Sequence, residues 1–402
     1  MQQTVVPKTI VLKPIVLKPI VLTWQLSEIH GWGLVGLHTV LHLLDQGQTP
    51  LLAERPLLSA LRPANRARIE PLLEAQQRLA ALVRQAGDKV LCLEGTTVLQ
   101  ALGNGFVPGA AANLRGSRTV GVIAFEDTLF DADVLARARN YDRIVVHSTY
   151  NRNLLVEQGF TDVGLAFQGV DPDELAPAPP AGRFGDRFVV FSGGKIEFRK
   201  GQDIVLAAFR RFRERRPDAL LVTAWHNHWP HTSASIAESH HTPTPPAIGE
   251  NGRLRIVEWA MAHGVAPDGF IDMGVLGRDQ IAPILADCHA AVFPNRCEGA
   301  TNLVAMEAMA CGVPVILSAN TGHLDLIREG NCLPLSRQSP VPDPDGSRRG
   351  WGESSVEELV EQLDRLYTDR AAARDCAEKG RAFVRGERTW SGFARAFVEA
   401  VG

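Results

Sequence analysis

The six cysteines of this 402-residue chain form no recognisable metal or disulfide pattern. They are scattered between residue 92 and residue 376, and no two of them have the CxxC spacing. Structural zinc sites and the disulfide scaffolds of small secreted proteins both depend on closely spaced cysteines. The pattern therefore argues against either class of site and indicates free thiols in a reducing compartment.

The chain also lacks an uninterrupted apolar run of the length that a membrane span requires. A repeat near the N-terminus, IVLKPIVLKPIVL from Ile10 to Leu22, is broken twice by Lys-Pro pairs. A spanning helix needs about 20 consecutive apolar residues, and a secretory signal needs an unbroken apolar core before its cleavage site. We therefore expect an extended lead-in to the first strand. The expected location is the cytoplasm, with at most peripheral association with the inner face of a membrane.

Excess positive charge is missing as well. The formal net charge is −3, and charged residues make up an ordinary 22% of the chain. A protein whose main partner is nucleic acid normally carries a basic surface, so we expect no nucleic-acid partner. A small acidic ligand remains compatible, because a local cluster of lysines and backbone amides can hold it.

What the sequence does contain is a regular alternation of apolar strand-like runs and segments with helical spacing. This alternation is typical of an α/β fold with parallel sheets. The length of 402 residues favours two domains, and the Pro-, Ala- and Gly-rich stretch at 171–186 is the best boundary between them. We predict two Rossmann-like, doubly wound domains, 1–180 and 181–375.

Several strands and helices can be predicted from this pattern. A first strand at Ile20–Trp24 precedes a glycine-bearing turn, HGWGLVG, and a helix that ends near Asp45. After the boundary, Phe188–Ser192, Gln202–Arg216 and Ala219–Trp225 are expected to form a β-α-β unit.

The most informative segment is VFPNRCEGATNLVAMEAMACGVPVIL, Val292 to Leu317. Its pattern predicts a strand, a polar loop, and a helix from about Thr301 to Cys311. Thr301 or Asn302 is placed to cap the start of that helix. Gly312 suits a left-handed helix end, and Pro314 prevents the helix from continuing.

A helix that begins at the end of a strand is a candidate anion site, because its first N–H groups are unpaired and its dipole is positive there. A diphosphate would fit at this helix start. Glu307 then lies about 10 Å away, at roughly 1.5 Å per residue, where it can accept hydrogen bonds from two ribose hydroxyls. Glu298 is a candidate for orienting a transferred sugar. The alternative is an ordinary amphipathic helix with a solvated glutamate.

A second candidate element is the loop GGKIEFRKG, Gly193 to Gly201. Gly193 and Gly194 permit a tight turn after a strand, and Lys195 and Lys200 place two cations on one loop. Such cations can stabilise the charge that develops on a departing nucleoside diphosphate. By itself a glycine-rich turn with lysines is weak evidence, but its pairing with the later helix strengthens the hypothesis.

Together these motifs resemble the retaining GT-B glycosyltransferases of the group-1 family, whose two domains face each other across a cleft. In that family a loop at the start of the second domain carries an arginine and a lysine; here Lys195 stands at the arginine position and Lys200 matches the lysine. The family's two glutamates normally enclose seven residues, whereas Glu298 and Glu307 enclose eight. The resemblance implies that Glu307 binds the ribose and that the amides of residues 300–303 hold the donor. It also implies that the C-terminal segment 376–402 is a helix returning to the N-terminal domain.

The resemblance extends to weaker matches elsewhere. Residues 272–276 resemble the strand and turn beside the nucleotide base, and the loop ending at Gly33 resembles the family's N-terminal glycine loop. Glu126 stands where many relatives have a histidine, so it is a candidate contact for sugar or acceptor; a solvated acidic loop is the alternative. His147 and His30 are ambiguous, and a strand-end role is favoured for His147. The predicted catalytic residues are Lys195, Lys200, Glu298 and Glu126, and the predicted donor-binding residues are Gly33, Gly194, Gly274, Ala300, Thr301, Asn302, Leu303 and Glu307.

The implied reaction moves a hexose-type sugar from a UDP- or GDP-sugar to a hydroxyl of a glycan, lipid or protein, with retention at the anomeric carbon. No cofactor is expected, and no metal ion is required, because two lysines and a helix start can stabilise the leaving diphosphate. The histidines between His226 and His241 have no firm metal-ligand spacing. A loop carrying imidazoles toward a cleft is the favoured interpretation of that segment.

Three alternatives remain open at this point. A sugar-nucleotide epimerase of the same shape would use the donor without an acceptor. A catalytically silent nucleotide-sugar-binding protein would account for the altered glutamate spacing and for Lys195. A nicotinamide-dependent dehydrogenase is suggested by the GxGxxG of Gly31, Gly33 and Gly36 with Glu54 following. That fingerprint normally follows its strand directly, whereas here residues 25–30 intervene.

Overall fold

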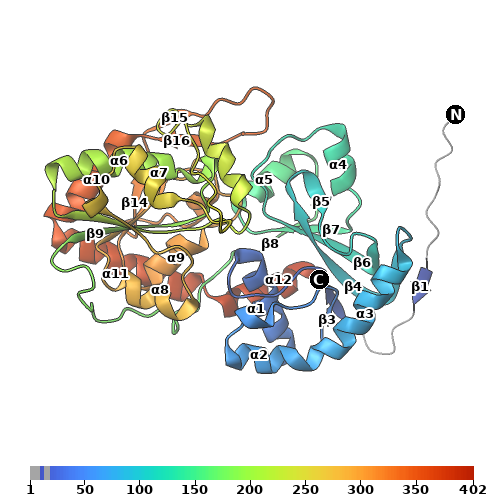
Figure 1. Cartoon of the computed structure of the whole chain (residues 1–402). Coiled ribbons are helices and arrows are strands. Elements are labelled where there is room, and N and C mark those ends of the chain that lie inside the picture. Colours follow the sequence, from blue (N-terminus) through green and yellow to red (C-terminus); the bar gives the residue numbers. More distant parts are fainter. Residues whose placement is uncertain (1–9, 13–18) are drawn as a thin grey trace. The chain divides into compact units, whose positions relative to one another are not determined.

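Two mainly parallel β-sheets organise the chain, each in its own unit (Figure 1). The structure is a computed structural model and describes residues 10–12 and 19–402. Unit 1 comprises Met1–Gln168, Asp345–Ser347 and Trp390–Gly402, and unit 2 comprises Gly169–Pro344 and Arg348–Thr389. The predicted α/β class with two parallel sheets is confirmed.

The unit boundaries differ from the predicted ones. The chain enters unit 2 at Gly169 instead of residue 181, before the Pro-rich stretch, because Val170 already pairs with Thr389 of the same unit. It leaves unit 2 after Thr389 instead of residue 375, since the long helix α11 (Arg370–Glu387) packs against α9 of unit 2. The segment that belongs to unit 1 is therefore Trp390–Gly402.

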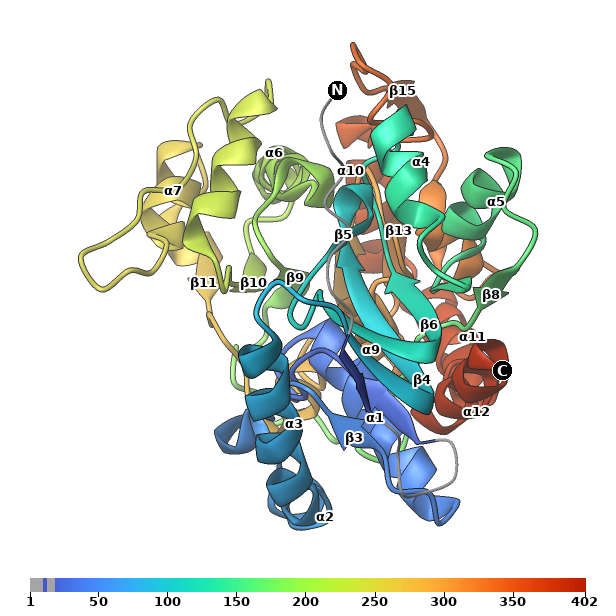
Figure 2. The ribbon, with the colours of Figure 1, turned by 90° about the vertical axis from the view of Figure 1, so that its right-hand side faces the viewer.

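In unit 1 the sheet has the order β3-β2-β4-β6-β7-β8 with parallel neighbours, and Figure 2 shows β4 and β6 side by side. β1 pairs with β4 in parallel, so part of the N-terminal repeat extends the sheet; its residues 13–18 lie outside the described part. The short β5 pairs with β4 antiparallel. The strands are β1 (Ile10–Leu12), β2 (Ile20–Leu22), β3 (Leu51–Leu52), β4 (Leu91–Gly103), β5 (Val107–Pro108), β6 (Leu114–Ile123), β7 (Arg143–Val146) and β8 (Val163–Leu165).

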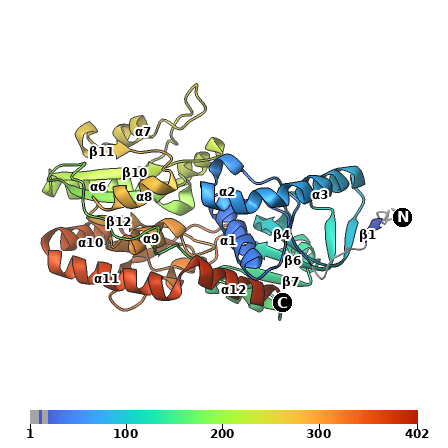
Figure 3. The ribbon, with the colours of Figure 1, turned by 90° about the horizontal axis from the view of Figure 1, so that it is seen from below.

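Helices cover this sheet and are anchored by local capping. Ser148 caps α5 by accepting a hydrogen bond from the Asn151 amide. The C-terminal α12 packs beside α1, where the His38 ring stacks on Trp390 (Figure 3). The helices are α1 (Gly31–Asp45), α2 (Pro63–Ile69), α3 (Leu73–Ala86), α4 (Ala132–Ala138), α5 (Thr149–Glu157) and α12 (Trp390–Val401).

In unit 2 the sheet is wholly parallel, with the order β11-β10-β9-β12-β13-β14, and β15 and β16 form a separate antiparallel pair. The strands are β9 (Phe188–Gly194), β10 (Ala219–Trp225), β11 (Phe270–Asp272), β12 (Ala290–Phe293), β13 (Val315–Ser318), β14 (Leu333–Leu335), β15 (Gln338–Pro340) and β16 (Gly352–Ser354). The helices are α6 (Gln202–Arg215), α7 (Ile256–Ala262), α8 (Arg278–Leu285), α9 (Leu303–Ala310), α10 (Val356–Thr368) and α11. The predicted β-α-β unit is thus β9-α6-β10.

Both faces of this second sheet are buried, which is the normal condition of a parallel sheet. Phe188 and Val190 of β9 pack with α6 and α10, whereas Val189 and Phe191 pack with α8 and α9 on the opposite face (Figure 1). Alternate residues of one strand thus supply two separate cores.

Within residues 10–12 and 19–402, no helix combines the length and the apolar character that crossing a bilayer would require.

Candidate functional site

The order of strands in unit 2 creates a switch point between β9 and β12. After β9, the strands β10 and β11 are added on one side of it. The chain then crosses to the other side of β9, where it adds β12, β13 and β14 in turn. In open α/β sheets, ligands bind outside the carboxyl ends of the strands at such a point. Both predicted motifs lie at the ends of these two strands: Gly194 ends β9 and Lys195 follows it, and the loop from Pro294 to Asn302 follows β12.

The two motifs touch at two glycines, where an added Cβ would come too close to the opposite motif. A Cβ on Gly193 would lie 2.8 Å from a methyl carbon of Val304 in α9, so the end of β9 rests on that helix. Gly201 has φ +71°, and a Cβ there would lie 2.3 Å from the carbonyl oxygen of Pro294. The glycine loop and the helix loop therefore form one edge of the sheet.

Lys200 and Glu298 form a buried ion pair at this edge, between Nζ and Oε1. Asn295 donates a second hydrogen bond to Oε1, and Nη1 of Arg199 lies 3.6 Å from Oε2. Burial alone would raise the pKa of Glu298, but the charges of Lys200 and Arg199 outweigh it and lower this pKa to about 2. Burial lowers the pKa of Lys200, opposed by the attraction of Glu298. Glu298 is thus a fixed anion beside two cations.

Lys195 lies on the same loop but has a different partner. Its Nζ is 2.8 Å from Oε1 of Glu197, and its side chain is 40% exposed. Gly194, at the end of β9, has φ +117° and open space where a Cβ would be. The two lysines therefore differ, since one is held inside the edge and the other reaches solvent.

A 3-10 turn after β13, Thr321–Asp325, supports the helix loop from behind. The hydroxyl of Thr321 accepts the Glu298 amide at 2.9 Å, and the Gly322 amide donates to the Glu298 carbonyl at 3.0 Å. A Cβ on Gly322 would lie only 1.6 Å from the carbonyl oxygen of Ala300. The backbone at Gly322 is therefore in direct contact with the backbone of residues 298–300, and this contact fixes their position.

Asn302 caps α9, in agreement with one of the two predicted capping residues. Its side chain accepts the Ala305 amide at 3.2 Å, and its backbone has φ +66°, a left-handed conformation that asparagine tolerates. The other face of its amide group donates to Nε2 of His323 at 3.0 Å. Since that nitrogen accepts, the proton of the neutral ring is on Nδ1, which lies 3.2 Å from the Ser318 carbonyl. Burial lowers the pKa of His323 to about 4, so the ring is neutral at pH 7.

The first turn of α9 leaves polar groups available. In the described part of the chain, the Asn302 side chain accepts the Ala305 amide. The backbone amides before Ala305 come too early in the helix to donate to a carbonyl of the preceding turn. The hydroxyl of Thr301 is fully buried and has no hydrogen-bond partner among the described residues. Buried polar groups normally have partners, so these groups indicate a ligand-binding position. Ala300, Thr301, Asn302 and Leu303 are all brought to this edge.

Glu307, one turn further along α9, is buried and therefore is not a solvated surface residue. Its Oε1 pairs with Nη1 of Arg278, and Arg278 also pairs with Glu174 at 3.2 Å. Burial raises the pKa of Glu307, opposed by Arg278. The sequence prediction missed Arg278, although it follows Gly274 by four residues and begins α8 at the neighbouring strand end.

The turn after β11 presents Gly274 in the left-handed region, with φ +61° and open space around it. Asp272 anchors the turn by accepting hydrogen bonds from the Thr223 hydroxyl at 2.7 Å and the Trp225 amide at 3.2 Å. Burial raises the pKa of Asp272. Gly274 is therefore at the same carboxyl edge, two strands from β9, and its contact with a donor stays a prediction.

Unit 1 holds the two remaining predicted residues. Gly33 is in the first turn of α1, where a Cβ would lie 2.1 Å from the Ser27 hydroxyl, and its amide donates to Nδ1 of the capping residue His30. Glu126 follows β6, and its amide donates to Asn104 at 3.1 Å. Each residue is at a carboxyl end of its sheet, and the roles predicted for them stay predictions.

His147 is a buried strand-end residue, as favoured from the sequence. Its Nδ1 lies 2.9 Å from the Ala166 carbonyl, and its ring packs with Trp32, Phe393 and Phe397. Burial lowers its pKa to about 4. The ring is therefore a neutral part of the core at pH 7.

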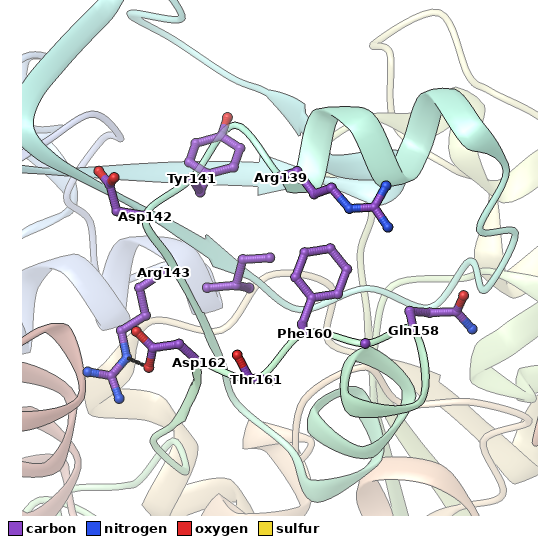
Figure 4. Close-up of a pocket in the computed structure, with 10 residues that line it drawn as sticks. Arg139, Tyr141, Asp142, Arg143, Gln158, Phe160, Thr161 and Asp162 are labelled. Carbon is purple, nitrogen blue, oxygen red and sulfur yellow. Dashed lines mark ion pairs between the residues drawn. The ribbon is translucent and has the colours of Figure 1, made fainter.

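A hollow of about 250 Å³ in unit 1 does not include the predicted site residues. Figure 4 shows Phe160 at its centre and the 3.0 Å ion pair of Arg143 with Asp162 at one end. Arg143 begins β7 and Asp162 immediately precedes β8, so this hollow is at the amino edge of the sheet. Ligands of such folds bind at the opposite edge, and we assign no role to the hollow.

Arg296 is a further charged residue that the sequence analysis overlooked, although it lies within the helix loop. Its side chain is fully buried and makes a bidentate pair with Asp203 at 2.9 and 2.6 Å. Its Nε donates to Oε2 of Glu353 at 2.9 Å. Burial would raise the pKa of Glu353, but contacts with His241 and Arg296 lower it to about 2. This network fastens the helix loop to α6 and β16.

The sequence model of the family described as "Glycosyl transferases group 1" matches residues 178–383, which is more than half of the chain. All predicted site residues of unit 2 are inside the matched region.

Two curated relatives are similar over part of their length. A GDP-mannose-dependent alpha-(1-6)-phosphatidylinositol monomannoside mannosyltransferase of Mycolicibacterium smegmatis is 27% identical over 50% of this chain and 48% of the relative. The uncharacterized glycosyltransferase YqgM of Bacillus subtilis is 25% identical over 60% of this chain and 56% of the relative. The chain thus spans about half the length of each relative.

Solved structures resemble the whole fold. The Anabaena protein HepE in complex with UDP has a TM-score of 0.61 at 13% identity, covering 95% of this chain and 99% of HepE. The sucrose-phosphate synthase of Thermosynechococcus elongatus has a TM-score of 0.64 at 16% identity, covering 95% and 98%. At these identities the likeness establishes the fold, which is GT-B. From the family match and the fold, we conclude that the chain belongs to the group 1 glycosyl transferases.

Proposed function

We propose that this chain is a retaining glycosyltransferase that moves a hexose from a nucleoside-diphosphate sugar to a hydroxyl of a glycan, lipid or protein. The observation that carries the proposal is the meeting of Lys200, Glu298 and the start of α9 at the switch point of unit 2. A cation, a helix start and an unpartnered buried hydroxyl at one strand edge suit a diphosphate.

The diphosphate is proposed to bind at the amides of residues 300–303, with the Thr301 hydroxyl as an additional donor. Lys200 stabilises the charge that appears on the departing diphosphate, and Glu298 holds Lys200 in position. Lys195, which reaches solvent, is proposed as the second cation. Catalysis then consists mainly of positioning and charge stabilisation and requires no metal ion at the phosphates.

Glu307 is proposed to bind the ribose. Its carboxylate is held by Arg278 through one oxygen, and a carboxylate has acceptor capacity for further hydrogen bonds. Two vicinal hydroxyls can donate to it, while the charge of Arg278 opposes the effect of burial on its pKa. Gly194 and Gly274 are proposed to admit the donor closely, and the proposed contacts of Gly33 and Glu126 with sugar or acceptor complete the assignment.

The relatives support a donor of the uridine or guanosine class. The mannosyltransferase is named for GDP-mannose, and HepE has crystal structures in complex with UDP and with UDP-glucose. Both ligands share the diphosphate and the ribose that the residues at this edge are proposed to bind. The base is therefore the first property to determine.

The test begins with thermal shifts of the full chain in UDP, GDP and ADP, followed by turnover of the matching hexose donors with candidate acceptors. We expect one diphosphate to stabilise the protein, and the Glu307→Gln variant to bind it at least tenfold more weakly, since one hydrogen bond to a charged group contributes about 1.5–3 kcal/mol and each 1.4 kcal/mol is a factor of about ten. Product NMR should show the anomeric configuration of the donor. Sugar release or epimerisation without an acceptor, or an inverted product, would contradict the proposal.

A further inference from the structure

Three metal-binding side chains gather outside the proposed donor edge. His240 and His241 follow the 3-10 segment Pro230–Glu238, and Glu353 is the middle residue of β16. One ligand atom from each lies within 4.8 Å of the other two. Glu353 is more than a hundred positions from the two adjacent histidines in the sequence, so only the fold brings it to them.

The separations fit a zinc-like coordination sphere. Oε1 of Glu353 is 3.3 Å from Nε2 of His241 and 3.6 Å from Nδ1 of His240. With bonds of about 2.0–2.1 Å to a tetrahedral ion, neighbouring ligand atoms are about 3.3–3.4 Å apart. The three atoms therefore lie close to where a bound ion would need them.

The ligand oxygen has the two imidazoles close to it but accepts no hydrogen bond of good geometry. Oε1 of Glu353 is buried, and no described residue makes a hydrogen bond to it. The imidazole nitrogens are near it without hydrogen-bond geometry. A buried anionic oxygen without a hydrogen-bond partner is unusual, and a cation between it and the two rings would satisfy it.

The ligands are oriented from behind by one hydrogen-bond network. Arg296 donates to the other oxygen of Glu353 and pairs with Asp203. The Ser239 hydroxyl donates to Asp203 at 2.6 Å and accepts the amide of His241 at 2.9 Å. Supporting contacts of this kind orient the ligands of protein metal sites and tune their affinity.

We propose that His240, His241 and Glu353 bind a divalent transition-metal ion of the zinc class. Two imidazoles and one carboxylate suit zinc, whereas magnesium and calcium prefer oxygen ligands alone. Water supplies the fourth ligand, because the His240 side chain is 72% exposed. The ion connects the histidine segment to β16 and, through Arg296, to the helix loop that carries Glu298. Its role is structural and separate from the diphosphate.

The test uses the full chain without an affinity tag, stripped with a chelator and titrated with Zn²⁺ by calorimetry and with Co²⁺ by visible absorption. We expect one ion per chain, a tetrahedral Co²⁺ spectrum that Zn²⁺ abolishes, and a raised melting temperature. His241→Ala and His240→Ala should each weaken binding at least tenfold. Both variants are expected to fold, since each side chain is on a surface segment, and circular dichroism checks this.

His231→Ala is the matched control, because His231 is an exposed histidine of the same segment outside the cluster. Its zinc affinity should equal that of the unmodified chain. Absence of stoichiometric binding would overturn the proposal. So would equal losses in the control and the cluster variants, or tighter binding of Mg²⁺ than of Zn²⁺.

Discussion

The carboxyl edges of the two sheets differ in how they use charge. In unit 2, the edge carries Lys200 with Glu298, Arg278 with Glu307, and Arg296 with Asp203, all buried or nearly so. In unit 1, the described residues of the corresponding edge include a single buried carboxylate, Glu28, whose partner Arg62 is 40% exposed. Two further groups at this edge are not in buried ion pairs: His147 packs among aromatic rings, and Asn104 accepts the backbone amide of Glu126.

Ionic groups are costly to bury unless they are paired and hydrogen-bonded. A fold that keeps three such pairs at one edge uses them for binding or for precise positioning, and the proposed ligand of unit 2 is itself highly charged. The edge of unit 1, with one such pair in its described part and that one half exposed at Arg62, suits a partner that carries less charge, such as an acceptor hydroxyl. Four measurements, from the largest expected effect to the smallest, can break or sharpen this contrast.

Arg296→Met should produce the largest loss of stability. The substitution leaves the Asp203 carboxylate fully buried without its cation, and breaking a buried pair in this way costs about 3–5 kcal/mol. Urea unfolding at pH 7 measures the change. A loss below about 1 kcal/mol would show that the buried network of unit 2 is no more important than a surface pair.

Lys200→Ala should lower kcat by about 100- to 1000-fold, since removing one charge-stabilising donor has an effect of that size. Because Lys200 also pairs with buried Glu298, some stability is lost as well. The double variant Lys200→Met/Glu298→Gln removes both charges and separates the two effects. Lys379→Ala, which removes an exposed lysine paired with Asp375, is the control. Near-normal turnover by a folded Lys200→Ala protein would contradict the assigned role.

Acidification should destabilise unit 1 through His147. Its pKa is about 4 in the folded protein and 6.5 when exposed, so the unfolded chain takes up the proton first as the pH falls. The contribution of the neutral His147 ring to the free energy of unfolding is complete above pH 6.5. It is lost between pH 6.5 and 4, at about 1.4 kcal/mol per pH unit. His147→Phe should reduce the slope of unfolding free energy against pH by that amount. An unchanged slope would show that the ring is not buried and neutral.

Arg68→Met should have the smallest effect. Arg68 pairs with Asp45 in unit 1, and the two side chains are 40% and 60% exposed. Exposed pairs contribute about 0–1 kcal/mol. A loss comparable with that of Arg296→Met would remove the contrast between the two units.

The sequence predicted the framework of the site well because each signal was local. The glycines after β9, the asparagine cap of α9 and Gly312, with φ +75° at its end, act within a few residues of themselves. The β9-α6-β10 unit followed from apolar periodicity.

The partners of the charged residues could not be predicted in the same way. Lys200 and Glu298 are 98 residues apart, and Arg296 and Asp203 are 93 apart. Spacing does not reveal which strand ends become neighbours until the order of the sheet is known. Arg278, His323 and Arg296 were therefore missed, although each is near the end of a strand in the predicted sheet. The unit boundary differs from the predicted one because the Pro-rich stretch belongs to unit 2 along its whole length.

The close approach of Gly322 to Ala300 limits how this site can diverge. A Cβ at Gly322 would lie only 1.6 Å from the Ala300 carbonyl oxygen. A substitution of this glycine would therefore displace the backbone around the proposed diphosphate position. Homologous enzymes with other sugar or base preferences are therefore expected to differ in side chains around the rim, such as the exposed Met273 and Val275 beside Gly274. An engineer seeking a new donor would vary those two positions and leave the glycine unchanged.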